Sequence, residues 1–144
     1  MSTNQAVAVD LSLAIAREDW TRAGALLADD FLSVGDGRPA LDKAEYLHLM
    51  RHVLQSGTVE LHVSFSRCLA EGPLVALEYT NTRLHGRTLP GMAVTVRRII
   101  ASGHLVREVK AGQVTREWQS TDAARLMAQL RAPYRALRSG GTHG

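Results

Sequence analysis

The chain has 144 residues, of which 45% are hydrophobic and 22% are charged, with a formal net charge of +3. A chain of this length folds as one domain and buries roughly two thirds of its surface. The sequence has no apolar run of about 18 residues, which excludes a membrane-spanning helix. Its single cysteine excludes a disulfide framework and a thiolate metal cluster. We therefore expect a soluble protein in the reducing cytoplasm.

The basic residues are spread along the chain rather than gathered in one segment. The exception is Arg131, Arg135 and Arg138, close to a Ser-Gly-rich end. Nucleic-acid-binding domains concentrate basic and aromatic residues on one face. We therefore expect neither a nucleic-acid partner nor a membrane partner, and we predict one domain over residues 1–138 with a flexible tail over 139–144.

The first third of the chain has the hydrophobic spacing of helices. Leu11 and Ile15 lie at helical spacing in the first of them, and Asp19 is the expected N-cap of the second. A short strand over 31–34 follows. After a loop rich in glycine and proline, a third helix is expected over 42–55.

Beyond this third helix the pattern changes to alternation, which is typical of strands. Leu61, Val63 and Phe65 share one strand face, and Tyr79 and Asn81 share another. Short connections indicate antiparallel neighbours. The expected strands are 59–69, 74–84, 92–101, 104–109 and 113–118.

The most informative stretch is the last hairpin together with the helix that follows it. A turn over 110–112 joins two β-type runs, and Gly112 can supply the positive φ of a tight turn. The second run carries Trp118 and leads to Asp122, where a helix over 123–130 is expected to begin. An acid half-buried beside an aromatic ring acquires a raised pKa, which suits acid–base chemistry near neutral pH.

Two parts of the chain resemble a known family. Asp19-Trp20 followed by residues 25–31 resembles the opening of the nuclear-transport-factor-2-like superfamily. Within it, the end of the chain resembles the SnoaL-like polyketide cyclases, through residues 102–107, 111–114 and 117–122. The resemblance covers about residues 10–130. It implies an α+β fold, a cone-shaped α+β barrel with a strongly curved, mostly antiparallel sheet and three to four helices on its concave side.

The same resemblance implies roles for individual residues. Asp122 corresponds to the family's catalytic acid/base, and His104 to a histidine that lines the same cavity. An ungapped count back from Trp118 places that histidine at Leu105, and His104 matches only if the turn carries one extra residue. Without the resemblance, Asp122 is better explained as a helix cap and Trp118 as a core residue.

Four further residues are candidates for substrate binding. Tyr79 and Asn81 offer hydrogen-bonding groups if their strand face lines a cavity, and a buried dimer face is the alternative. Met50 is expected in the core or in the cavity wall. Asp36 is a candidate second acid, although alignment with the related steroid isomerases places their base at Gly35. The oxyanion tyrosine of those isomerases has no counterpart on the first helix, which disfavours that activity.

No metal and no cofactor is expected. His48 and His52 are four residues apart on one helix, but no third ligand lies at a matching spacing. The sequence also lacks a glycine-rich phosphate loop and a nucleophilic serine motif.

The resemblance implies a cofactor-free cyclase that forms a carbon ring in a polyketide-type intermediate. Ring closure would use acid–base (aldol-type) or shape-driven cycloaddition chemistry in an apolar cavity. One alternative is an epoxide-opening or ether-forming (oxa-conjugate) cyclase or hydrolase, with Asp36 as the second acid. Another is a non-catalytic small-molecule-binding or dimerisation module. A homodimer is expected, because three helices cannot cover the whole sheet.

Overall fold

The computed structural model describes residues 2–35, 37–55, 58–87, 95–131 and 135–136. Asp36 and the predicted tail over 139–144 lie outside these residues. The helices are α1 (Thr3–Ala16), α2 (Trp20–Leu26), α3 (Lys43–Gln55) and α4 (Ala123–Leu130). The strands are β1 (Leu27–Gly35), β2 (Leu41–Asp42), β3 (Thr58–Glu71), β4 (Leu74–Arg87), β5 (Thr95–Lys110), β6 (Gln113–Thr121) and β7 (Arg135–Ala136).

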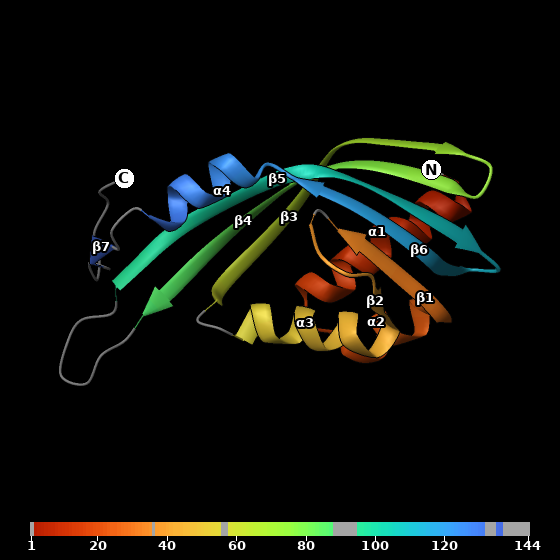
Figure 1. The fold of residues 1–144 in the computed structure, drawn as a ribbon, viewed down its shortest axis with the longest axis horizontal. Helices are drawn as coiled ribbons and strands as arrows, with labels where there is room; N and C mark the ends of the chain where they lie inside the picture. The colour runs from red at the N-terminus through yellow and green to blue at the C-terminus, as the bar shows by residue number, and fades with distance from the viewer. Residues whose placement is uncertain (1, 36, 56–57, 88–94, 132–134, 137–144) are drawn as a thin grey trace.

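The strands form one open, strongly curved sheet in the order β2-β1-β6-β5-β4-β3, with β7 paired to β5 (Figure 1). Only β1 and β6 run parallel, and every other described pair is antiparallel. Helices α1, α2 and α3 lie against the concave side, whereas α4 lies along β5 near one end of the sheet (Figure 1). The predicted α+β architecture with a curved, mostly antiparallel sheet is confirmed.

Side-chain caps begin all four of the described helices. The side chains of Ser2, Asp19, Asp42 and Asp122 each accept a hydrogen bond at 2.9–3.1 Å from the backbone N–H three residues further on. These bonds satisfy N–H groups that the first helical turn leaves free. The predicted caps at Asp19 and Asp122 are confirmed. Among the described residues, no helix has the length and apolar character needed to cross a membrane.

Several boundaries differ from the sequence prediction. Strand β1 begins at Leu27, directly after α2, rather than at Phe31. Strand β5 is continuous over 16 residues, so the predicted break at residues 102–103 is wrong. Gly103 is needed there for close approach rather than for a turn, because a Cβ at this position would lie 2.1 Å from the Ser120 carbonyl oxygen.

The turn between β5 and β6 agrees with the prediction. Lys110 pairs with Gln113 across a two-residue loop. Ala111 has a φ of 50° and Gly112 a φ of 77°. Two successive positive φ values give a turn whose twist matches that of the flanking strands.

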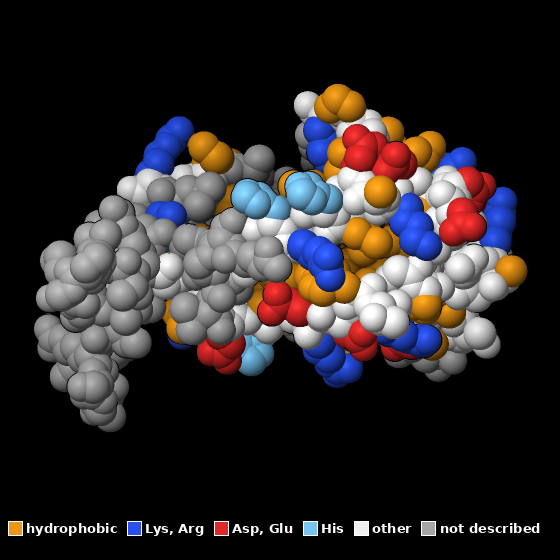
Figure 2. All heavy atoms as spheres, turned by 90° about the horizontal axis from the view of Figure 1, so that it is seen from below, with side chains coloured by type: hydrophobic (Ala, Val, Ile, Leu, Met, Phe, Trp, Pro, Cys, Tyr) orange, Lys and Arg blue, Asp and Glu red, His pale blue; other side chains and the backbone are white. Residues whose placement is uncertain are grey.

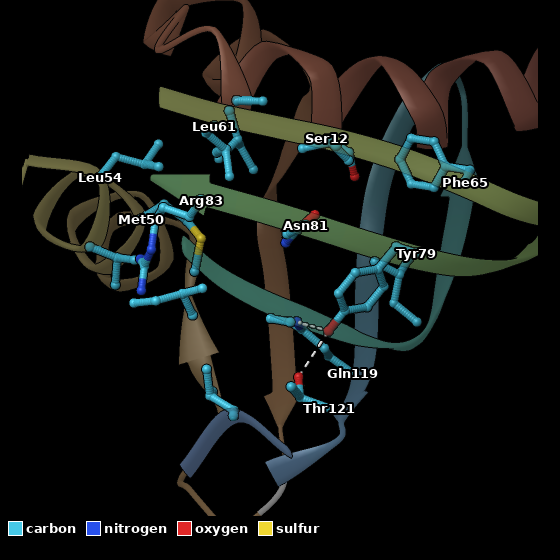
Figure 3. Close-up of a pocket in the computed structure, with 18 of the residues that line it drawn as sticks. Ser12, Met50, Leu54, Leu61, Phe65, Tyr79, Asn81, Arg83, Gln119 and Thr121 are labelled. Atoms are coloured by element: carbon cyan, nitrogen blue, oxygen red, sulfur yellow. Dashed lines mark hydrogen bonds between the residues drawn. The ribbon is translucent and has the colours of Figure 1, made fainter. Parts of the chain in front are cut away.

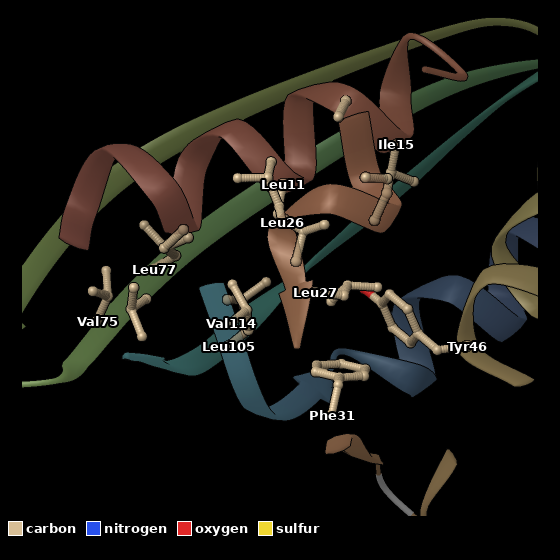
Figure 4. Packing of buried hydrophobic residues seen from close by; sticks show 14 of the residues in the cluster. Leu11, Ile15, Leu26, Leu27, Phe31, Tyr46, Val75, Leu77, Leu105 and Val114 are labelled. Carbon is tan, nitrogen blue, oxygen red and sulfur yellow. The ribbon is translucent and has the colours of Figure 1, made fainter. Parts of the chain in front are cut away.

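The hydrophobic core lies where α1, α2 and β1 meet the concave side of the sheet (Figure 4). Phe31 of β1 packs edge-to-face against Tyr46 of α3, with ring centroids 5.0 Å apart. This core fills one end of the space between the curved sheet and the helices on its concave side, a space that we call the cone. The largest buried apolar side chains around it include Leu11, Leu27, Leu77, Val75, Val109 and Val114.

The surface seen from the helical side carries acidic and basic side chains interspersed with apolar ones (Figure 2). Two of the ion pairs of the helices are Arg22–Asp10 and Lys43–Asp29, each with a closest N–O distance of 3.6 Å. One partner of each pair is largely exposed, so water screens the pairs and they contribute little to stability.

Candidate functional site

The end of the cone beyond the core remains open as a cavity of about 290 Å³ (Figure 3). Its walls come from the concave side of β3, β4, β5 and β6, from α1 and α3, and from one residue of α4. The apolar lining consists of Ile15, Ala16, Met50, Val53, Leu54, Leu61, Val63, Phe65, Ile99, Ala101, Leu105 and Leu126. The polar lining consists of Ser12, Tyr46, Tyr79, Asn81, Arg83, Arg107, Gln119 and Thr121.

A hydrogen-bonded cluster of Tyr79, Gln119 and Thr121 lies in this cavity (Figure 3). The Gln119 amide donates to the Tyr79 hydroxyl at 2.9 Å, and the Tyr79 and Thr121 hydroxyls share a hydrogen bond of 2.8 Å. Gly103 pairs with Tyr79 on one side and with Thr121 on the other. Because glycine has no side chain, nothing on the intervening strand separates the two hydroxyls. The sequence analysis did not identify Gln119 or Thr121.

A fully buried carboxylate, Glu117, lies beside the cavity. Its Oε2 accepts from Arg107 Nε at 2.9 Å and from the Tyr46 hydroxyl at 3.1 Å, while its Oε1 accepts from Ser33 at 3.2 Å. Burial and the negative charge of Glu117 raise the pKa of Tyr46 well above the ordinary range of a phenol. Tyr46 is therefore neutral, and its hydroxyl proton points at Glu117.

The residues predicted to be catalytic lie on the other side of the sheet. Asp122 is exposed and caps α4. The His104 side chain is 73% exposed, and its Nε2 lies 3.1 Å from Glu78 Oε2. Both residues border a polar depression of about 420 Å³ on the outer side, formed with Ser66, Glu78, Ser102 and Ser120 among others.

The expectation that Trp118 and Asp122 face the apolar cavity is wrong. Trp118 is 41% exposed and does not line the cavity. The cause is an irregularity in strand pairing, because Glu108 pairs with Arg116 whereas the next residue, Val109, pairs with Val114. The extra residue on β6 reverses which side chains point inward.

Val114 lies before this bulge in β6 and points inward. After the bulge, the inward-pointing residues are Glu117, Gln119 and Thr121. Simple alternation places Val114 and Trp118 on one strand face. The hydrophobic pattern alone therefore predicts the wrong orientation for the tryptophan.

The ambiguity between His104 and Leu105 has a structural answer. Leu105 is buried and lines the cavity, whereas His104 points outward to Glu78. The cavity position in this strand is thus occupied by leucine. A hydrogen bond from Ser66 and, next, one from His104 lower the pKa of Glu78.

Three of the predicted substrate-binding residues lie in the cavity wall. Tyr79 and Asn81 project from β4, and Met50 projects from α3 (Figure 3). Whether they bind a substrate stays a prediction. The sequence analysis also missed the polar groups of Ser12, Arg83 and Arg107. Arg83 lies on the same face of β4 as Tyr79 and Asn81, so the twofold repeat of the strand could have identified it.

The chemistry available inside the cavity is that of hydrogen-bond donors and cations. Among the described residues, none of those lining it is Asp, Glu or His. In the described part of the chain, no three His, Cys, Asp or Glu side chains are grouped closely enough to hold a metal ion. The arrangement suits a mostly apolar molecule with a few oxygen atoms.

A family model describes the same chain independently. The model of the SnoaL-like polyketide cyclases matches residues 6–130. The chain belongs to this family. No curated protein matches the chain in sequence.

Solved structures of several bacterial proteins share the fold. A candidate SnoaL-like polyketide cyclase from Shewanella putrefaciens has 14% identity and a TM-score of 0.77, covering 90% of this chain and 97% of that one. IdmH, a candidate polyketide cyclase from Streptomyces antibioticus, has 17% identity and a TM-score of 0.77, covering 90% and 99%. An epoxide hydrolase of the LEH-like type from M. tuberculosis has 21% identity and a TM-score of 0.67, covering 90% of both chains. At these identities the likeness establishes the fold alone.

Proposed function

We propose that this chain is a cofactor-free cyclase that closes a carbon ring in a polyketide-type intermediate. The observation that supports it most is the cavity of about 290 Å³, whose lining is mainly apolar and whose donors converge on the Tyr79 hydroxyl. The family supports the substrate class. A cavity of this kind would hold a flexible chain folded, so that two distant carbon atoms meet and much of the entropic barrier to ring closure is removed.

Tyr79 is the residue that would act on the substrate in this cavity. Its hydroxyl accepts from Gln119, which leaves the hydroxyl proton for Thr121 or for a substrate carbonyl. A hydrogen bond to that carbonyl withdraws electron density from the adjacent alkene or enol, which favours both cycloaddition and aldol closure. Gln119 would position Tyr79, and Asn81 would supply a second polar contact.

Acid–base catalysis by Asp122 and His104 needs a substrate in the depression on the outer side of the sheet. Both residues are exposed to water there, and neither lines the apolar cavity, although Tyr79 and Thr121 border both pockets. Charged side chains that are exposed to water interact only weakly with neighbouring charges. A reactive enolate formed there would also be open to solvent. Ring closure inside the apolar cavity, at Tyr79, is therefore the route that we favour.

The test uses a set of linear polyenes and poly-β-ketone thioesters, with mass spectrometry of the products. A cycloaddition product keeps the mass of its substrate, and an aldol condensation product has lost one water. We expect such a product from the wild-type chain and at least about tenfold less from Ala101→Phe, which fills the cavity. Ala76→Phe, on the exposed side of β4, is the matched control and should behave as wild type.

Two other results would replace the proposal. A product that has gained one water from an epoxide substrate would indicate a hydrolase, the activity of the M. tuberculosis neighbour. Saturable binding of the linear compounds in the cavity with no conversion would indicate a non-catalytic binding module.

We also propose a homodimer through the outer side of the sheet. Val34 pairs with Trp118 there, and both side chains are about two-fifths exposed next to Leu32. Exposed apolar side chains grouped on a sheet are typical of an interface. Sedimentation of the wild-type chain and of Trp118→Ser, with a shift towards monomer in the variant, tests this assembly.

A further inference from the structure

Arg107 is a buried cation in the cavity wall. The Arg107 side chain is only 3% exposed and lines the cavity. Nε donates to Glu117, and Nη1 donates to the Ala8 carbonyl and to Ser12 Oγ, the latter at 2.7 Å. Within the described part of the chain, Nη2 donates no hydrogen bond. Arg107 lines the cavity, so an acceptor that enters the cavity can take a hydrogen bond from this N–H group.

Ser12 supplies a second donor at the same place. Its Oγ accepts from Arg107 Nη1, so its own hydroxyl proton must point elsewhere. Ser12 lines the cavity, and its oxygen points from α1 towards the cavity interior (Figure 3). In the described residues, this hydroxyl donates to no other group. Ser12 and Arg107 therefore present two unused donors beside each other.

The charges around Arg107 define the acceptor. Glu117 is fully buried and lies 2.9 Å from Arg107 Nε, so the two charges compensate each other. A carboxylate bound at Nη2 would be repelled by Glu117 across a medium of low polarity. A carbonyl oxygen avoids this repulsion and still gains from a charge-assisted hydrogen bond, more so as it acquires negative charge.

We propose that Ser12 and Arg107 bind a carbonyl oxygen of the substrate, separately from the Tyr79 cluster. This inference rests on the proposed function and narrows its substrate to a compound with two carbonyl groups. One carbonyl binds at Tyr79 and the other at Ser12 and Arg107. Fixing both groups of one flexible chain sets the fold in which its ends meet.

The test uses methyl heptyl ketone with an isotope-labelled carbonyl, the full chain, and infrared difference spectroscopy together with calorimetric binding. Hydrogen bonds at Ser12 and Arg107 should move the carbonyl band to lower wavenumber than in hexane. Ser12→Ala should reverse part of this shift and weaken binding about twofold to tenfold, the loss of one hydrogen bond. Ser64→Ala, on the exposed side of β3, is the matched control and should leave both quantities unchanged.

A second variant separates binding from folding. Arg107→Met alone would leave Glu117 buried without its cation, so Glu117→Gln is made with it. This double variant should retain the fold and move the carbonyl band part of the way back towards its position in hexane. A band that changes in Tyr79→Phe but not in Ser12→Ala would overturn the inference and leave the proposed function standing. Tighter binding of octanoate than of the ketone would also overturn it. Failure of the ketone to enter the cavity would overturn both.

Discussion

Strand β6 has two sides that differ in chemistry, and the difference runs against expectation. Its outward side carries Trp118 and Ser120 and leads to Asp122, in contact with water. Its inward side carries Gln119 and Thr121, which line the cavity. Trp118 and Asp122, the residues that the sequence makes conspicuous, are thus outside, whereas the β6 side chains that line the cavity are uncharged hydrogen-bonding groups. Residue type alone does not locate a site when a single bulge can exchange the two sides of a strand.

The largest expected effect distinguishes the buried ion pair from the surface ones. Arg107→Ala should destabilise the fold by about 3–5 kcal/mol, because Glu117 would remain buried without a cation. Urea unfolding followed by circular dichroism measures this. Arg22→Ala, which breaks the exposed pair with Asp10, is the control and should have little effect. Equal losses in the two variants would show that the inner network contributes no more than the surface.

The next effect is a dependence of stability on alkaline pH. The pKa of Tyr46 is raised in the folded chain, chiefly by burial and then by Glu117. The stabilisation that protonated Tyr46 gives to the folded chain is therefore complete below the pKa of an unfolded tyrosine, about 10. It is lost as the pH rises above that value. The free energy of unfolding should fall by up to about 1.4 kcal/mol per pH unit there. Tyr46→Phe should give a shallower slope, and an unchanged slope would contradict the assignment.

On the outer side, the expected effects are smaller. Asp122→Ala should lower the free energy of unfolding by about 1 kcal/mol, because the N-cap hydrogen bond from the Arg125 N–H is removed. Asp122→Asn should stay close to wild type, since asparagine caps a helix equally well. Thermal unfolding monitored by circular dichroism compares the two variants. A loss as large for asparagine as for alanine would mean that the charge, rather than the cap, stabilises α4.

The smallest effect concerns Glu78 and acid. The hydrogen bonds from Ser66 and His104 lower the pKa of Glu78. The stabilisation that ionised Glu78 gives to the folded chain is therefore present above the ordinary carboxyl range and is lost as the pH falls through the lowered pKa. Glu78→Gln should make the acid limb of the stability curve slightly shallower. Acid titration of the unfolding midpoint measures this, and a steeper limb in the variant would have the wrong sign.

The sequence was sufficient for features set by local physics. The helix caps at Asp19 and Asp122 and the turn at Gly112 follow from side-chain hydrogen bonds and backbone freedom within a few residues. The shared face of Tyr79 and Asn81 follows from the twofold repeat of a regular strand. The family resemblance supplied the architecture.

The features that failed depend on contacts distant in the sequence. The orientation of Trp118 is set by the bulge near Thr115, which no residue pattern announces. Glu117 is buried because Tyr46, Ser33 and Arg107 satisfy it, and these residues come from three different elements. A charged residue in a strand is ordinarily read as exposed, so only the assembled fold reveals this network.

The central claim is that ring closure takes place on the concave side of the sheet, at Tyr79, and not on the outer side, at Asp122. The most direct measurement is the turnover of one linear substrate by Tyr79→Phe and Asp122→Asn, each folded as judged by circular dichroism. Tyr79→Phe should lower turnover about a hundredfold, as expected for removal of a donor to a developing oxyanion, while Asp122→Asn leaves it within about threefold of wild type. A large loss in Asp122→Asn with full activity in Tyr79→Phe would contradict the account.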